Sequence, residues 1–190
     1  MPHSFFRSSG YTAKPIIQTS DGNEFDLSTL SPFLRTLMVM DGTVTKALSA
    51  WFWEPIRVVS IHNKIEVLDE GIEGLKVSTG DLLLRREVAL CGDKSQQTFA
   101  CARSQVSLGH LPSSISESLK KGEMGIGELL RENGIETYRD IFNLDYQQHN
   151  LTDPILSGFD CPVFSRSYRI RVNQIPAIIV TEFFPIDQYS

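Results

Sequence analysis

The fold of this chain is decided by the stretch Arg169-Ile170-Arg171-Val172-Asn173-Gln174-Ile175-Pro176-Ala177-Ile178-Ile179-Val180-Thr181-Glu182-Phe183-Phe184-Pro185. Two runs rich in β-branched and aromatic residues flank the polar pair Asn173-Gln174, which predicts a β-hairpin. Side chains alternate between the two faces of a strand, so Glu182 shares a face with Val180 and Phe184. A carboxylate on an apolar face is costly unless it is paired or bound to a ligand. The hairpin therefore predicts a sheet and, at Glu182, a site.

A second run carries a buried arginine in the same way. Residues 82–90 read Leu-Leu-Leu-Arg-Arg-Glu-Val-Ala-Leu, and alternation puts Arg86 on one face with Leu84 and Val88. A turn at residues 92–95 and a strand-like run at residues 98–106 complete another hairpin. In that return strand Arg103 shares a face with Phe99 and becomes a further inward candidate. Buried charges of opposite sign predict a closed site for a small anionic molecule.

Segments with helical spacing lie before and between these hairpins. Ser31-Pro32 is typical of a helix N-cap followed by proline at the first helical position, and Thr43 is placed to cap a second helix. Strand-like runs begin at Ile56 and Ile65. Further helices are predicted at residues 114–121, 126–133 and 136–142, followed by a loop over residues 143–162. Because every short strand connection is a hairpin, we expect a mainly antiparallel sheet and an α+β fold. We expect a flexible N-terminal arm at residues 1–23 and one domain at residues 24–190.

Composition limits the possible partners. The 190 residues carry a formal net charge of −5, which argues against general binding to nucleic acid. No run of about 18 apolar residues occurs, so no membrane span is predicted. The four histidines lack metal-ligand spacing, and we predict no metal site. Three cysteines without a CxxC pair or a secretory leader indicate a cytoplasmic location.

Four blocks of the sequence resemble the chorismate pyruvate-lyases, also called 4-hydroxybenzoate synthases. They stand in the family's order over residues 34–185, and the stretch from Pro176 to Glu182 is similar to that of a longer-chain branch of the family. The blocks are Leu34 to Leu48, Arg86-Glu87-Val88-Ala89-Leu90 with its partner Ala102-Arg103, Met124 to Leu130, and Tyr168 to Phe184 with its Thr181-Glu182 pair. Val44 and Ile126 stand where the compact members of the family carry methionine and leucine.

The resemblance implies an activity and a set of site residues. It implies an internal ligand cavity covered by helices, chorismate as substrate, and pyruvate and 4-hydroxybenzoate as products, without a cofactor. The product would serve prenylquinone or related aromatic biosynthesis. By position, Arg86 would bind the ring carboxylate and Glu182 would face the hydroxyl end, and these two are the catalytic candidates. Val44 and Ile126 would line the pocket and present backbone N–H groups at helix starts.

Several alternatives stay open at this point. Arg103, Arg169 and Arg171 are candidate substrate-binding residues, but Arg169 and Arg171 share a face and also fit a solvated stripe. Arg86 could instead pair with a buried carboxylate, and Glu182 could anchor Arg169 or Arg171. The whole chain could also be a free-standing small-molecule sensor, since the same fold serves as the effector-binding domain of some transcription regulators. The sequence does not determine the oligomeric state.

Overall fold

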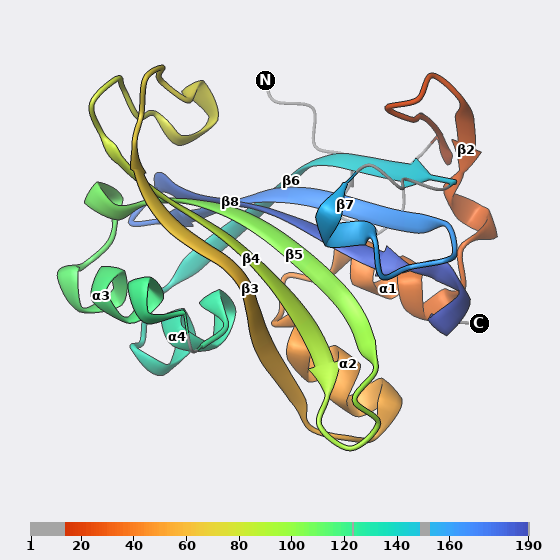
Figure 1. Ribbon diagram of the computed structural model, residues 1–190. Coiled ribbons are helices and arrows are strands. Elements are labelled where there is room, and N and C mark those ends of the chain that lie inside the picture. Colours follow the sequence, from red (N-terminus) through yellow and green to blue (C-terminus); the bar gives the residue numbers. More distant parts are fainter. Residues whose placement is uncertain (1–13, 123, 149–152, 190) are drawn as a thin grey trace.

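A six-stranded antiparallel sheet forms the centre of the protein (Figure 1). The computed structural model describes residues 14–122, 124–148 and 153–189. The sheet has the order β3-β4-β5-β8-β7-β6, and its strands are β3 (Ile56–Val67), β4 (Leu82–Gly92), β5 (Thr98–Ser107), β6 (Thr137–Gln147), β7 (Val163–Val172) and β8 (Ile175–Pro185). A small hairpin of β1 (Ile16–Gln18) and β2 (Glu24–Asp26) precedes it. The predicted antiparallel α+β fold is confirmed.

Four helices cover one face of this sheet. They are α1 (Pro32–Val39), α2 (Val44–Phe52), α3 (Ser113–Lys121) and α4 (Ile126–Glu132). Ser31 caps α1 as predicted, since its hydroxyl accepts a hydrogen bond from the Leu34 N–H. One apolar cluster joins α1 and α2 to β4, β7 and β8, and a second joins α3 and α4 to the same sheet face. The site lies between these two clusters.

The segment after α4 corrects one prediction. Residues 136–142 were expected to be helical and the following residues a loop, but residues 137–147 form the edge strand β6. Its residues pair with β7 from Thr137 opposite Val172 to Gln147 opposite Val163. The β-branched and aromatic residues of the segment favour a strand once a neighbouring strand offers hydrogen-bond partners. Likewise, the two runs expected at Ile56 and Ile65 are one strand with a bulge.

The N-terminal segment is described only in part. Residues 1–13 of the predicted arm lie outside the described residues. From Lys14 the chain enters β1, and the Ser20 N–H and hydroxyl donate to the Asp145 carboxylate at 2.9 and 2.7 Å. The limits at residues 1–23 and 24–190 stay a prediction.

Two further observations concern the chemistry of the described segments. No helix in them is long and apolar enough to cross a membrane. Cys91, Cys101 and Cys161 are all free thiols, the first two buried. The cytoplasmic location stays a prediction.

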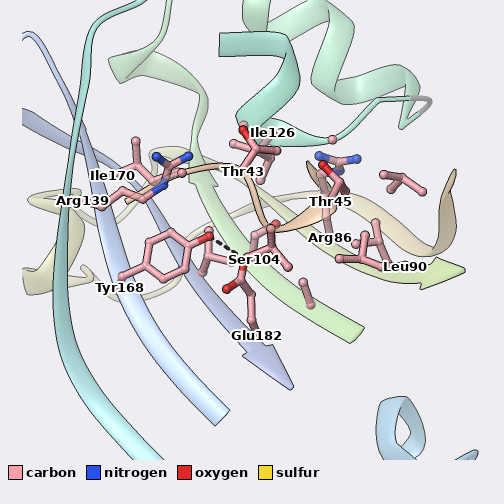
Figure 2. A pocket seen from close by; sticks show the side chains of 18 residues that line it. Thr43, Thr45, Arg86, Leu90, Ser104, Ile126, Arg139, Tyr168, Ile170 and Glu182 are labelled. Atoms are coloured by element: carbon pink, nitrogen blue, oxygen red, sulfur yellow. Dashed lines mark hydrogen bonds between the residues drawn. The ribbon is translucent and has the colours of Figure 1, made fainter. Parts of the chain in front are cut away.

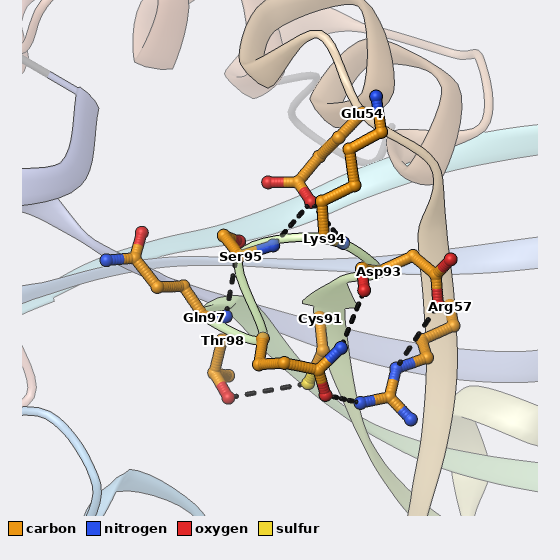
Figure 3. A network of polar contacts seen from close by, with 9 residues as sticks. Glu54, Arg57, Cys91, Asp93, Lys94, Ser95, Gln97 and Thr98 are labelled. Carbon is orange, nitrogen blue, oxygen red and sulfur yellow. Dashed lines mark hydrogen bonds and ion pairs between the residues drawn. The ribbon is translucent and has the colours of Figure 1, made fainter.

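The end of α2 is tied to the turn between β4 and β5 (Figure 3). Glu54 accepts hydrogen bonds from the backbone N–H groups of Lys94 and Ser95 at 2.7 and 2.9 Å. These bonds, chiefly the one from Ser95, hold the pKa of Glu54 below its usual range. Ser49, within α2, donates to the Glu54 carbonyl at 2.6 Å. The C-terminal end of α2 is therefore fixed to the sheet, while its N-terminal end lies over the cavity.

Candidate active site

The floor of the site is one face of the four central strands. On this face Arg86 of β4 lies opposite Ser104 of β5, which lies opposite Val180 of β8. In the adjacent row, Glu182 of β8 lies between Ala102 of β5 and Arg166 of β7. The alternation of side chains thus brings the two buried charges of the sequence to the same face, two strands apart.

The roof comes from the connections that lead into α2 and α4. Residues 42–45 and 125–127 close over the floor and leave a cavity of about 70 Å³. Figure 2 shows Thr43 and Ile126 above the cavity, Arg86 and Leu90 toward one end, and Tyr168 and Arg139 toward the other. The remaining lining side chains are mainly aliphatic. They include Val58, Val88, Ile170 and Val180.

Arg86 is buried without a counter-ion. Its residue is 2% exposed, and its Nη2 donates to the Met124 carbonyl at 3.0 Å. Its Nε has no partner, and it forms no ion pair with any carboxylate of the described chain. Burial lowers the pKa of this guanidinium. The structure therefore does not support the alternative of a buried structural pair, and the free donors of Arg86 suit an anion.

Glu182 is held by Arg166 and Tyr168, and not by Arg169 or Arg171 as the sequence alternative had it. Its Oε2 accepts from Nε of Arg166 at 2.7 Å, and its Oε1 accepts from the Tyr168 hydroxyl at 2.8 Å. Arg166 also donates to the carbonyls of Leu37 and Met40, which ties this ion pair to the end of α1. Burial, reinforced by Glu182, raises the pKa of Tyr168, so the phenol stays a donor. Glu182 is thus a charge-compensated acceptor at the cavity wall.

The three other arginines that were candidates for binding the substrate lie on the opposite face of the sheet. The structure therefore corrects the prediction that they contact the substrate. Arg103 pairs with Glu87 at 2.6 Å and with Asp153 at 2.9 Å. Arg169 and Arg171 lie 2.9 and 4.0 Å from the Asp140 carboxylate. The physical reason is register, because Arg103 lies opposite Glu87, the neighbour of Arg86, and therefore points the other way. None of the three lines the cavity.

Val44 and Ile126 line the cavity, each as the first residue of a helix. Neither N-cap residue, Thr43 or Gly125, makes a side-chain capping bond. The first backbone N–H groups of a helix have no intrahelical partner, and at the starts of α2 and α4 no capping side chain satisfies them. Such groups favour a negatively charged ligand.

Sequence reasoning missed the polar residues Arg139, Arg166 and Tyr168. Arg166 and Tyr168 share an apolar strand face with Phe164 and Ile170. The search for polar residues on apolar strand faces that identified Arg86 would therefore have identified them as well. Arg139 was hidden because its segment was predicted as a helix. In the described part of the chain no cluster of three or more His, Cys, Asp or Glu side chains could hold a metal ion.

Solved structures share this arrangement of sheet and helices. The chain is similar to PhnF from Mycobacterium smegmatis, with a TM-score of 0.62 and 16% identity over 80% of this chain and 67% of that one. It is similar to the effector domain of PhnF, with a TM-score of 0.60 and 16% identity over 78% and 91%. YydK from Bacillus subtilis, described as a possible transcriptional regulator, gives a TM-score of 0.59 and 14% identity over 93% of this chain and 74% of that one. At these identities the likeness shows the fold alone.

Sequence comparison defines the family. The model described as chorismate pyruvate-lyase, Rv2949c-like, matches residues 38–189. A protein named chorismate pyruvate-lyase from Mycobacterium leprae (strain TN) is 32% identical over 158 residues, which are 80% of this chain and 73% of that protein. The chain belongs to the Rv2949c-like chorismate pyruvate-lyase family.

Proposed function

We propose that this protein eliminates pyruvate from chorismate and releases 4-hydroxybenzoate. Chorismate carries a ring carboxylate, a ring hydroxyl and an enolpyruvyl ether with its own carboxylate. In the reaction the ether C–O bond breaks, and its electron pair leaves with the enolpyruvyl oxygen. A proton leaves the ring carbon that bears the hydroxyl, and the methylene carbon of the departing group gains one. The atoms balance without an oxidant or a reductant, and aromatisation of the ring supplies the driving force.

The geometry supports a role for each charged group. The planar guanidinium of Arg86 offers two parallel donors to the ring carboxylate, assisted by the backbone N–H groups at Val44 and Ile126. Glu182 would accept the hydrogen bond of the ring hydroxyl from the opposite side. Positioning of the substrate and fixed charges in a mainly apolar cavity are the means by which this elimination would be accelerated. We therefore propose catalysis without metal, nucleotide or flavin.

A single observation carries the proposal: a guanidinium without a counter-ion is buried in an apolar cavity that faces a compensated carboxylate. The test is to incubate the purified protein with chorismate and follow pyruvate and 4-hydroxybenzoate together. Equal molar amounts of both, unchanged by a chelator, are expected. A chelator-sensitive rate restored by a divalent ion would reject the metal-free mechanism.

A second candidate is a ligand sensor without turnover. It is favoured by the likeness to the PhnF effector domain, which shares the fold. The same incubation separates the two, because a sensor would bind chorismate or 4-hydroxybenzoate but release no pyruvate. As a lyase, the protein would act in the cytoplasm and provide the aromatic precursor of prenylquinones or related phenolic compounds.

A further inference from the structure

Arg139 lies at the end of the cavity opposite Arg86. The two residues are on β6 and β4, which are four strand spacings apart, or roughly 19 Å between backbones. Both side chains line the same cavity, and Figure 2 shows them at its opposite ends. The site therefore has a positive group at each end.

The contacts of Arg139 leave its charge uncompensated. One Nη donates to the backbone carbonyl of Asp41, and its Cζ lies 5.9 Å from the ring centroid of Tyr168. Its Nε is buried without a partner. It forms no ion pair with any carboxylate in the ranges that the structure describes, and its neighbour Asp140 pairs with Arg169 on the other face.

Among the residues described, the cavity therefore has two positive groups without a counter-ion. Glu182 is compensated by Arg166, so Arg86 and Arg139 remain. Asp41 is an exposed residue whose charge acts on Arg166, and it does not line the cavity. The proposed substrate has two carboxylates, whereas the aromatic product has one. A site with two separated cations therefore matches the substrate better than the product, since each unpaired buried charge is costly.

We propose that Arg139 binds the carboxylate of the enolpyruvyl group and so selects the dicarboxylate substrate over the monocarboxylate product. This inference rests on the proposed lyase function. After the ether bond breaks, the second carboxylate departs with pyruvate, and the product keeps only its contact with Arg86. Arg139 is then a specificity-determining residue that contacts the leaving group.

The test compares two stable ligands by calorimetry. The dicarboxylate is 3-(carboxymethoxy)-4-hydroxybenzoate, and the monocarboxylate is 4-hydroxybenzoate. Arg139→Gln should lower the affinity for the dicarboxylate on the order of 10- to 100-fold, as expected for loss of a charge-assisted hydrogen bond. The affinity for 4-hydroxybenzoate should change by less than about 3-fold. Arg139→Lys should restore part of the loss, because it keeps the charge without the planar fork. Arg131→Gln, an exposed arginine on α4, is the matched control and should change neither affinity.

Kinetics provide a second readout. With chorismate, Arg139→Gln should raise KM while the inhibition constant of 4-hydroxybenzoate stays constant. Equal weakening of both ligands would overturn the inference, because it would mean that Arg139 only holds the Asp41 connection in place. If the glutamine variant does not fold, the lysine variant decides by the same comparison. A protein that shows the ligand difference but no pyruvate release would reject the lyase function and keep the role of Arg139.

Discussion

Replacing Arg86 by methionine should stabilise the fold while it removes ligand binding. Methionine keeps the apolar stem of the side chain but removes the guanidinium. In the native protein that group donates a hydrogen bond to the Met124 carbonyl at 3.0 Å and leaves Nε unpaired. A buried unsatisfied donor costs about 1–3 kcal/mol, and a buried charge without a counter-ion adds to this cost. The bond that is lost offsets part of the gain.

The net effect expected for Arg86→Met is a rise of about 1–2 kcal/mol in the free energy of unfolding. For a domain of this size that corresponds to a Tm higher by about 2–8 °C. The affinity for 4-hydroxybenzoate should fall by on the order of 2–4 kcal/mol, because the partner of its carboxylate is gone. Arg86→Lys should bind with intermediate affinity, since a single ammonium cannot reproduce the two-point contact.

The assay combines urea unfolding with calorimetry on the same preparations. Arg85→Met is the matched control, since Arg85 is the adjacent residue on the other face, half-exposed and paired with Glu66. It should leave product affinity unchanged and give no gain in stability. Destabilisation by Arg86→Met together with unchanged product affinity would refute the reasoning and make Arg86 a structural residue.

Three other expectations follow from the same contacts. Glu182→Gln should lower kcat with little loss of 4-hydroxybenzoate affinity, but it leaves the Arg166 charge uncompensated, so a lower Tm should accompany it; an unchanged kcat would remove Glu182 from the reaction. Burial raises the pKa of the Cys101 thiol to about 12, so the folded state keeps a proton that the unfolded chain loses above pH 9. The free energy of unfolding should therefore fall by up to about 1.4 kcal/mol per pH unit between pH 9 and 12. In a Cys101→Ala variant, the free energy of unfolding measured with urea at each pH should fall less steeply over this range. Bound 4-hydroxybenzoate should protect amides at residues 42–45 and 125–127 from hydrogen exchange as well as those of β4 and β8, because these connections form the roof of the cavity. Protection limited to the strands would show that these connections do not close over the bound ligand.

The local alternation of side chains determined much of this protein. The apolar faces around Arg86 and Glu182 predicted two hairpins and two buried charges, and the structure places both charges on one sheet face. Ser31 and Pro32 likewise predicted the start of α1. These features depend only on neighbours in the sequence, since strand alternation and helix capping act over a few residues.

Tertiary pairing decided what remained. Residues 137–147 form a strand because β7 offers a ladder of partners interrupted only by an irregularity between Ile141 and Asn143, and no local window of sequence contains those partners. Alternation puts Arg103 on one of two faces, but only the register with Glu87 and the packing of four helices show which face is the cavity. Glu182 is held by Arg166 and Tyr168 across the β7–β8 ladder, and Arg139 reaches the same cavity from the sheet edge. Contacts between strands distant in sequence depend on register and on which face is covered, and both are properties of the assembled sheet.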